Sequence, residues 1–415
     1  MSAPAPVLEI YVVWHPDDDE GANIAQRLFE HFHGTVFSGL IGGGIELYVR
    51  SEGWVDAASP PRPIPVSSGA FPDISPAEFV AIVPVVGKGL ARACEEVGSV
   101  WFDYIGNFCK SEREDSNVGI FPYRIESDAM HGTKVSELLS SYQLIAPEQS
   151  NEGDSAEGLM CRDLVQGIAQ LLGESSAGRL KVFISHTKRD NPEEAENVGE
   201  LISLVRSVIG QTRLQSFFDA HDLQPGTDWA SELESEAAHS ALLAIRTDLF
   251  ASREWCQREV SISKQAGMPI VILDSLGFAE ERGSFLMDHV PRVAARKLDE
   301  AWRREDIYRA LNLLVDECLK RAVWTHQKRL VAGLLPEPIW WAPHAPEPLT
   351  LVGWLSELAA DSMQGAGDDR TLHVLHPDPP LGAAERLVLE QIVELRGQAL
   401  EIDILTPRQL AARGG

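Results

Sequence analysis

The sequence predicts an α/β protein built on doubly wound parallel sheets. Short apolar runs typical of buried strands alternate with stretches of helical period along most of the 415 residues. Polar or proline-rich junctions interrupt this alternation of strands and helices. The chain is also too long to fold around one ordinary hydrophobic core. We therefore expect an N-terminal α/β domain over 1–145, a linker over 146–177, a second α/β domain over 178–325, and a small C-terminal α/β unit over 326–415.

The N-terminal domain begins with a strand followed by a helix. Residues 7–14 form an apolar run that predicts a buried strand, and the acidic residues 17–20 after it are typical of a helix start. Two further apolar runs, 45–49 and 79–86, predict more strands of the same sheet. Strand, loop, helix and strand in this order favour a parallel arrangement. The polar, acidic stretch 147–155 has nothing to bury, which indicates an exposed linker.

The second domain has the clearest pattern in the chain. Its expected strands are separated by stretches of helical period, such as 194–209, as in a doubly wound sheet. The strands are 180–185, 214–218, 241–245 and 269–273.

The C-terminal unit follows a proline-rich junction over 336–343. A strand ending in His-Pro-Asp at 376–378 leads there into a helical run over 382–396, and the same order of strand and His-Pro-Asp occurs at 10–17. This is either a weak internal repeat or the independent use of a good strand-to-helix turn, in which proline fixes φ and aspartate caps the helix. With only one more expected strand, 401–405, the unit should be small.

Composition excludes several classes of function. Lys and Arg total 36 against 62 Asp and Glu, a formal net charge of -26, which repels phosphate backbones and anionic lipid. We therefore expect no nucleic-acid partner, although the net charge of the whole chain does not exclude a local basic pocket. The 5 cysteines are odd in number and lack CxxC spacing, which disfavours a disulfide framework or a zinc site and fits a reducing compartment. With no signal peptide and no apolar run long enough for a membrane span, we expect a cytoplasmic protein.

Trp255 and Glu259 are the most informative pair of residues in the chain. They follow the expected strand 241–245, and a spacing of four places the indole and the carboxylate on one face of a helix. A strand that leads into such a helix puts this face at the carboxyl edge of a sheet, where open α/β folds bind ligands. A carboxylate beside an aromatic wall suits a cationic or electron-poor substrate. The alternatives are a solvated helix glutamate and a core tryptophan.

The second domain resembles a Toll/interleukin-1 receptor (TIR) domain of the bacterial type. Three pieces are similar to family motifs: 182–190 to the first strand and its loop, 217–229 to the second strand and its long loop, and 252–259 to the helix with Trp-x-x-x-Glu. Each piece alone is weak, but their order and spacing are specific. The resemblance implies a flavodoxin-like doubly wound parallel sheet.

The TIR family includes enzymes that cleave NAD, releasing nicotinamide and ADP-ribose or a cyclised isomer. The resemblance implies that Glu259 is the catalytic residue, because it matches the helix glutamate of those enzymes. NAD would be the substrate, with no cofactor and no metal, and His186 has no partner at ligand spacing. The residues expected to bind the substrate are Trp255, Ser185, His186, Thr187, Lys188, Asp219 and Trp229.

The same resemblance leaves other functions open. Some TIR domains are adaptors that self-associate without catalysis, and others make a cyclic ADP-ribose signal. For an NAD-cleaving enzyme we expect a homo-oligomer or filament formed through TIR domains, a protein or small-molecule trigger, and a role in bacterial antiphage or stress defence. Cys256 has no arranged base and is expected to be a buried helix cysteine.

The N-terminal α/β domain has two interpretations, a degenerate TIR-like sheet or an α/β sheet unrelated to that family. It contains Trp101, but Ile105 stands where the second domain has Glu259. Without that carboxylate, a sensor or oligomerisation role is favoured over catalysis. A weaker alternative is a nucleoside-processing enzyme, which only the α/β pattern suggests.

Overall fold

The chain is an α/β protein with several parallel sheets. The computed structural model describes residues 6–34, 36–37, 44–66, 77–146, 156–173, 180–187, 192–212, 214–218, 235, 237–280, 282–328, 335–336, 338–361, 370–395 and 400–413. It divides into two compact units, Met1–Ser176 and Ala177–Gly415. In the described part, no helix is both long enough and apolar enough to cross a bilayer.

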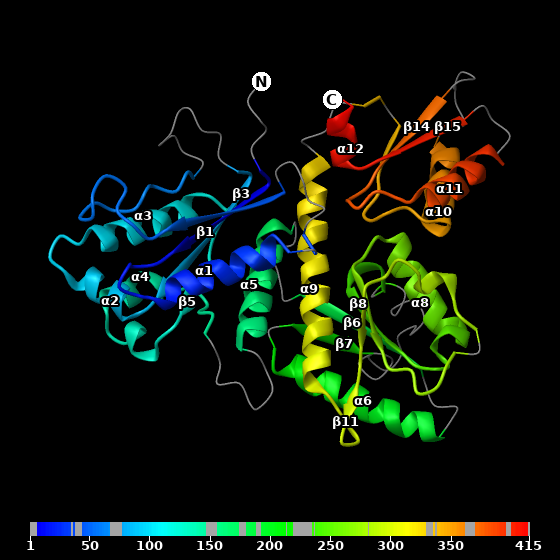
Figure 1. Ribbon diagram of the computed structural model, residues 1–415, viewed down its shortest axis with the longest axis horizontal. Helices are drawn as coiled ribbons and strands as arrows, with labels where there is room; N and C mark the ends of the chain where they lie inside the picture. The colour runs from blue at the N-terminus through cyan, green and yellow to red at the C-terminus, as the bar shows by residue number, and fades with distance from the viewer. Residues whose placement is uncertain are drawn as a thin grey trace. The chain divides into compact units, whose positions relative to one another are not determined.

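A parallel sheet in the order β2-β1-β3-β4 forms the centre of the first unit (Figure 1). Every residue of β1 and β3 is buried, because helices pack on both faces of the sheet. The short β5 pairs with the end of β3 beyond β4. The strands are β1 Leu8–Val13, β2 Ile45–Arg50, β3 Phe79–Val86, β4 Val118–Ile120 and β5 Tyr123–Arg124.

Helices cover this sheet, and one of them lies where a linker was expected. Helix α5 spans Ala156–Leu172, packs against β3 and β4, and buries Leu164, Val165 and Ile168. Over these residues the chain is part of the first unit, because this apolar helical face has a sheet to cover. The stretch 147–155 lies outside the described residues. The other helices are α1 Glu20–Phe32, α2 Lys88–Glu95, α3 Val100–Glu114, the 3₁₀ turn η1 Ser127–Met130 and α4 Lys134–Leu139.

The larger sheet of the second unit is parallel and has the order β10-β9-β8-β6-β7. Four of its strands coincide with the expected ones, and the short β10 is the strand that sequence patterns did not indicate. The chain leaves β6 toward one side to form β7 and returns to the other side to form β8. The strands are β6 Lys181–His186, β7 Gln215–Phe218, β8 Ala241–Arg246, β9 Ile270–Asp274 and β10 Arg292–Ala294.

Long helices cover the two faces of this sheet. Figure 1 shows α8 and α9 on the two sides of β6 and β8, and α9 packs against α6 as well as β8 and β9. The helices are α6 Pro192–Gly210, α8 Glu254–Gln265 and α9 Arg304–Gln327, with the 3₁₀ turns η2 Phe250–Ser252 and η3 Phe285–Met287. A small hairpin, β11 Lys297–Leu298 and β12 Ala301–Trp302, precedes α9.

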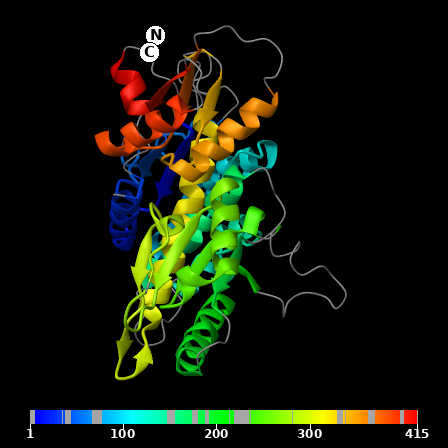
Figure 2. The same ribbon diagram turned by 90° about the vertical axis from the view of Figure 1, so that its right-hand side faces the viewer.

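A three-stranded parallel sheet in the order β13-β14-β15 completes the second unit. It has its own apolar core, which includes Leu351, Val374 and Ile404. Figure 2 shows this sheet and its helices at one end of α9. The elements are β13 Ile339–Trp341, α10 Pro348–Asp361, β14 Arg370–Leu375, α11 Ala383–Glu394, β15 Leu400–Leu405 and α12 Pro407–Ala412.

Helix α9 joins the three-stranded sheet to the larger one. The boundary expected between residues 325 and 326 falls inside this helix. Trp324, near its end, stacks on Trp341 with ring centroids 4.1 Å apart and donates its indole N–H to the Ala342 carbonyl at 2.7 Å. The buried Lys264 Nζ on α8 lies 2.9 Å from the Glu347 carboxylate before α10. These contacts explain why residues 177–415 form one compact unit.

Candidate functional site

The candidate site lies at the carboxyl edge of the larger sheet, where β6 and β8 end and α8 begins. Ser185, near the end of β6, donates its hydroxyl to the Glu259 carboxylate on α8, with Oγ 2.5 Å from Oε2. Ser185 is 1% exposed and Glu259 is 7% exposed. The structure therefore brings together two residues that the sequence assigned to one site, and it buries both of them.

Glu259 occupies the face of α8 that packs on the sheet. The neighbours on this face are Cys256 and Val260, both buried. Spacings of three and four place these residues on one side of a helix. A buried carboxylate must accept hydrogen bonds or lose solvation energy, and Ser185 supplies one donor. The reading of Glu259 as a solvated surface residue is therefore wrong.

Trp255 is half-buried and has a partly structural role. Its ring packs against the apolar cluster formed around β8, β9 and α8. The guanidinium carbon of Arg258 lies 5.4 Å from the ring centroid, within the range of a cation–π contact. Trp255 is thus neither a fully buried core residue nor a bare aromatic wall.

The loop after β6 is fixed by backbone and hydroxyl contacts. His186 Nδ1 lies 3.0 Å from the Thr187 carbonyl oxygen, and the Cys256 thiol donates to the His186 carbonyl at 3.7 Å. Thr187 Oγ1 lies 3.1 Å from Thr247 Oγ1, which follows β8. Thr247 is 2% exposed and was not among the expected site residues. A hydroxyl directly after an apolar strand was the signal that could have indicated it.

Three of the expected binding residues, Lys188, Asp219 and Trp229, lie outside the described residues. Of the expected loop 185–188, the structure therefore describes the contacts of Ser185, His186 and Thr187.

A second cluster of charges at the same edge was also missed by the sequence patterns. Arg246, the last residue of β8, donates from Nε to Glu280 at 2.7 Å, and its Nη1 lies 3.3 Å from Asp274 at the end of β9. Asp248 accepts the backbone N–H groups of Gly277 and Phe278, at 2.9 and 3.0 Å. The Asp248 contacts hold the loop after β9 in place, and the carboxylates of Glu280 and Asp274 neutralise Arg246. An arginine that ends an apolar strand was the available signal.

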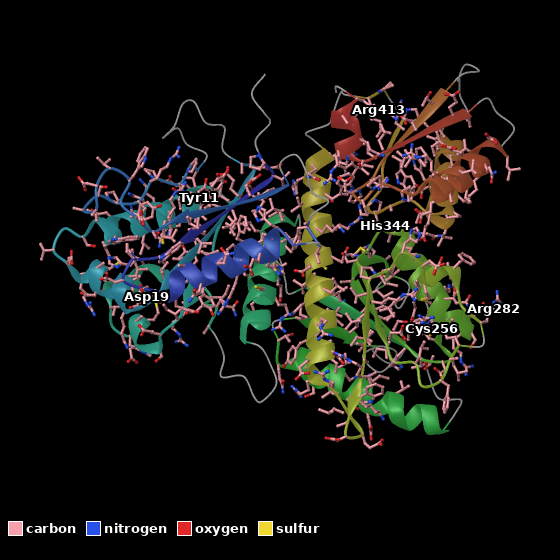
Figure 3. The ribbon with its side chains drawn as sticks, in the orientation of Figure 1. Tyr11, Asp19, Cys256, Arg282, His344 and Arg413 are labelled. Atoms are coloured by element: carbon pink, nitrogen blue, oxygen red, sulfur yellow. The ribbon has the colours of Figure 1, made fainter. Side chains whose placement is uncertain are left out.

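Cys256 lies near the Glu259 carboxylate, and its thiol is unreactive. It is 3% exposed, and Figure 3 labels it on α8. Burial, reinforced by the nearby Glu259 charge, raises the pKa of its thiol to about 12. The thiol is therefore protonated at neutral pH, which agrees with a packing role and not with a nucleophile.

The arrangement suits the stabilisation of positive charge. A buried carboxylate interacts more strongly with a nearby developing cation than an exposed one does, because the local dielectric constant is low. Within the described residues, no group of three or more His, Cys, Asp or Glu side chains is placed to hold a metal ion.

The first unit has apolar residues at the corresponding helix positions. Trp101 and Ile105 on α3 are 8% and 0% exposed and belong to the core, and the His15 ring lies 5.2 Å from the Trp101 ring. The buried acid at this edge is Asp18, whose oxygens accept the N–H groups of Gly89 and Leu90 at 2.7 and 2.8 Å. Asp18 therefore caps a helix, a structural role.

Comparisons with known proteins add nothing to this geometry. No protein-family model matches the sequence, and no curated protein matches it either. The arrangement around Glu259 and the motifs in the sequence are therefore the features that point to a function.

Proposed function

We propose that the second unit is a TIR-type NAD hydrolase that cleaves the bond between nicotinamide and ribose, with Glu259 as the catalytic carboxylate. Two structural features support this. The strand order of the larger sheet, 2-1-3-4-5 in chain order, is the order of flavodoxin-like sheets. The three sequence pieces similar to TIR motifs belong to the same unit, 177–415.

The observation that carries the proposal is the hydrogen bond from Ser185 to Glu259. It joins the first and third of those motifs at the carboxyl edge, where doubly wound folds bind ligands. It also fixes the rotamer of the carboxylate, so no reorganisation is needed when charge develops. The hydrogen bond between these two distant motifs thus holds the carboxylate in one orientation before substrate binds, as a preorganised site requires.

In the proposed reaction, the bond between ribose C1′ and the nicotinamide nitrogen breaks and its electron pair leaves with nicotinamide. Nicotinamide is neutral after it leaves, so no general acid is required. The ribose becomes oxocarbenium-like, and the Glu259 carboxylate stabilises this charge as carboxylates do in glycoside cleavage. Attack by water at C1′, followed by loss of a proton, gives ADP-ribose. Attack by a group of the same molecule gives a cyclised isomer.

The remaining expected residues receive binding roles in this proposal. The half-buried Trp255 would contact an aromatic ring of NAD. The loop of Ser185, His186, Thr187 and Lys188 would approach the ribose and pyrophosphate. Asp219 and Trp229 would gate the pocket and contact a neighbouring TIR domain.

Assembly and control also belong to the proposal. Because cleavage of NAD harms the cell that makes the enzyme, activity should remain low until a trigger promotes self-association into an oligomer or filament. A sensor role for the first unit agrees with the apolar Trp101 and Ile105 at its corresponding helix. The proposed role in antiphage or stress defence rests on the family resemblance, and the proposed cytoplasmic location rests on the cysteine content and the lack of a signal peptide.

The test is incubation of the full chain with NAD and identification of products by mass spectrometry. The parent should release nicotinamide, and Glu259→Gln should lose activity by roughly 10²–10³-fold, the usual cost of one key electrostatic contact. Glu254→Gln is the matched control, because Glu254 is exposed in the first turn of the same helix. If Glu259→Gln cleaves NAD at the parent rate, the assignment fails.

A second candidate function is a non-enzymatic TIR scaffold. The observation in its favour is the 7% exposure of Glu259, which a purely structural carboxylate would share. A scaffold would show no NAD turnover at any concentration, and Glu259→Gln would disturb folding or assembly instead. A chain that cleaves NAD to a cyclic product would be a signal-producing cyclase.

A further inference from the structure

The second unit contains a cavity of about 210 Å³ that the proposed function does not use. It lies where the three-stranded sheet meets the larger sheet and α9. The residues that matter for its chemistry are Lys264, Gly267, His289, Arg321, His344 and Asp378. Figure 3 labels His344 in this region.

The position of the cavity is typical of a ligand site. Its walls include Pro343–Ala345, in the loop after β13, and Pro377–Pro379, in the loop after β14. These loops lie at the carboxyl edge of a parallel sheet, the usual place for ligands in open α/β folds. The opposite wall includes Pro269 and Ile270, at the start of β9. The cavity is therefore at the opposite edge of the larger sheet from Glu259.

Most charged side chains in the lining are already paired. The pairs are Lys264 with Glu347 at 2.9 Å, Lys320 with Glu317 at 3.7 Å and His289 with Glu385 at 3.3 Å. Two further charged side chains of the lining, Asp378 and Arg321, have no counter-ion among the residues that the structure describes.

Asp378 is the first of these. It is 4% exposed, and neither carboxylate oxygen has a hydrogen-bond partner in the described part of the chain. Burying a carboxylate without donors is costly, so such groups are retained where they meet a ligand or a partner. The nearby His376 does not supply a counter-charge, because burial lowers its pKa.

Arg321 on α9 is the second. Its guanidinium is partly buried and forms no ion pair with any of the described residues. Burial lowers the pKa of this guanidinium. Gly267 leaves room for this side chain, since a Cβ there would come within 2.5 Å of Arg321 Nη1 and 2.6 Å of Pro343 Cγ. His344 does not compete for ligand charge, because burial and the nearby Lys264 and Arg321 lower its pKa to about 3.

We propose that this cavity binds a small zwitterion of the amino-acid type, with its ammonium group on Asp378 and its carboxylate on Arg321. A simple anion would leave Asp378 buried without a donor. A simple cation would make no use of Arg321, whose partly buried guanidinium lines the same cavity. One ligand with both groups satisfies both side chains by charge-assisted hydrogen bonds. The volume suits a ligand of amino-acid size, because pockets for drug-sized ligands start at about 300 Å³.

The test measures binding of each of the twenty common amino acids to the full chain, without NAD, by thermal shift and then calorimetry. A ligand that binds only the folded state raises the melting temperature. For the best binder, the amine lacking the carboxylate and the acid lacking the amine should each bind about 10- to 100-fold more weakly. Equal binding of either analogue would overturn the zwitterion.

Variants assign the binding to this cavity. Asp378→Asn and Arg321→Gln should each weaken binding about 10- to 100-fold. Glu401→Gln and Arg282→Gln, which change exposed residues outside the cavity, should bind like the parent. Without ligand, Asp378→Asn should melt at a higher temperature than the parent, because it removes an uncompensated buried charge.

The outcomes that overturn the proposal are distinct from those that overturn the NAD hydrolase. No thermal shift with any amino acid at millimolar concentration would exclude the zwitterion. Normal binding by Asp378→Asn, or a lower melting temperature of that variant without ligand, would show that Asp378 is structural. Glu259→Gln should bind the amino acid like the parent, so binding can be decided whether or not the chain cleaves NAD.

Discussion

Ser185 and Glu259 are 74 residues apart in the sequence, yet Ser185 Oγ lies 2.5 Å from Glu259 Oε2. The strand order of the larger sheet makes this contact possible, because β6 and β8 are neighbours and α8 follows β8 directly. The pair connects the first strand of the sheet to the helix after the third. The contribution of this hydrogen bond can be tested at Ser185, separately from the catalytic role assigned to Glu259.

Ser185→Ala should lower both stability and NAD cleavage. The buried Glu259 would lose a donor, which costs about 1–3 kcal/mol of unfolding free energy. The carboxylate would also lose its fixed rotamer, and misplacement of this kind lowers turnover by about 10- to 100-fold. Urea unfolding and NAD turnover measure the two effects.

Ser203→Ala is the control for that variant, because Ser203 is an exposed α6 residue whose hydroxyl donates to the Gly199 carbonyl at 2.7 Å. Its unfolding free energy should stay within about 0.5 kcal/mol of the parent. A Ser185→Ala chain as stable and active as this control would mean that the hydrogen bond has no function.

Cys256 should make stability fall at alkaline pH. Its thiol pKa is raised from 9.0 to about 12 in the folded chain, so the folded state keeps a proton that the unfolded state loses. The stabilising effect is complete below pH 9 and is lost as pH rises toward the folded value, with a slope of about 1.4 kcal/mol per pH unit. Urea titrations from neutral pH to pH 10 should show a smaller alkaline loss for Cys256→Ala. Parallel curves would contradict the burial of a neutral thiol.

Lys264→Ala should be strongly destabilising. The lysine is 3% exposed and its partner Glu347 is 7% exposed, so the change leaves a buried carboxylate without a counter-ion. Loss of one member of a buried pair costs about 3–5 kcal/mol. The double variant Lys264→Met with Glu347→Leu should unfold at a higher urea concentration than Lys264→Ala. A double variant that is less stable would show that the two side chains do not act as a pair.

Asp18→Ala should destabilise the first unit. Its carboxylate accepts the N–H groups of Gly89 and Leu90 at the start of α2, and caps of this kind contribute about 0.5–2 kcal/mol. Asp19→Ala is the control, because the side chain of Asp19 makes no capping hydrogen bond. The difference in melting temperature between these two variants measures the cap, and equal values would show that it is unimportant.

Residues 177–415, expressed without the first unit, should fold and show altered control of NAD turnover. The cut follows α5 because that helix packs on β3 and β4. Loss of an inhibitory sensor would raise the basal rate, and loss of an assembly surface would lower the triggered rate. Turnover at matched protein concentration, compared with the full chain, decides between these. Identical rates in both states would show that the first unit does not regulate the enzyme.

Local patterns were sufficient to predict the long buried strands, because strands covered on both faces are continuous apolar runs. The placement of Ser185 and Glu259 in one site was also predicted, since neighbouring parallel strands end at one edge, but their hydrogen bond was not. The short β10 was missed because Arg292–Ala294 has too few apolar residues to form a pattern. Helix α5 was missed because the acidic stretch before it dominated that region of the sequence.

The cavity could not be predicted from the sequence at all. Arg321 is on α9 and Asp378 follows β14, and nothing in either local pattern relates them. Their approach depends on how the three-stranded sheet packs on α9. The sequence did single out His-Pro-Asp at 376–378, but as a turn and a cap. In the described structure the Asp378 carboxylate caps no helix.

Helix α9 also determines how the second unit should unfold. It packs on β8 and β9, and its last turn places Trp324 against Trp341. Elements that share one packed helix open together, so we expect the two sheets to behave as one cooperative folding unit. Hydrogen exchange should then find similar opening free energies for amides of β8 and β14. Any evolutionary loss of the three-stranded sheet would have required replacement of the apolar surface around Trp324, so the two sheets are expected to be inherited together.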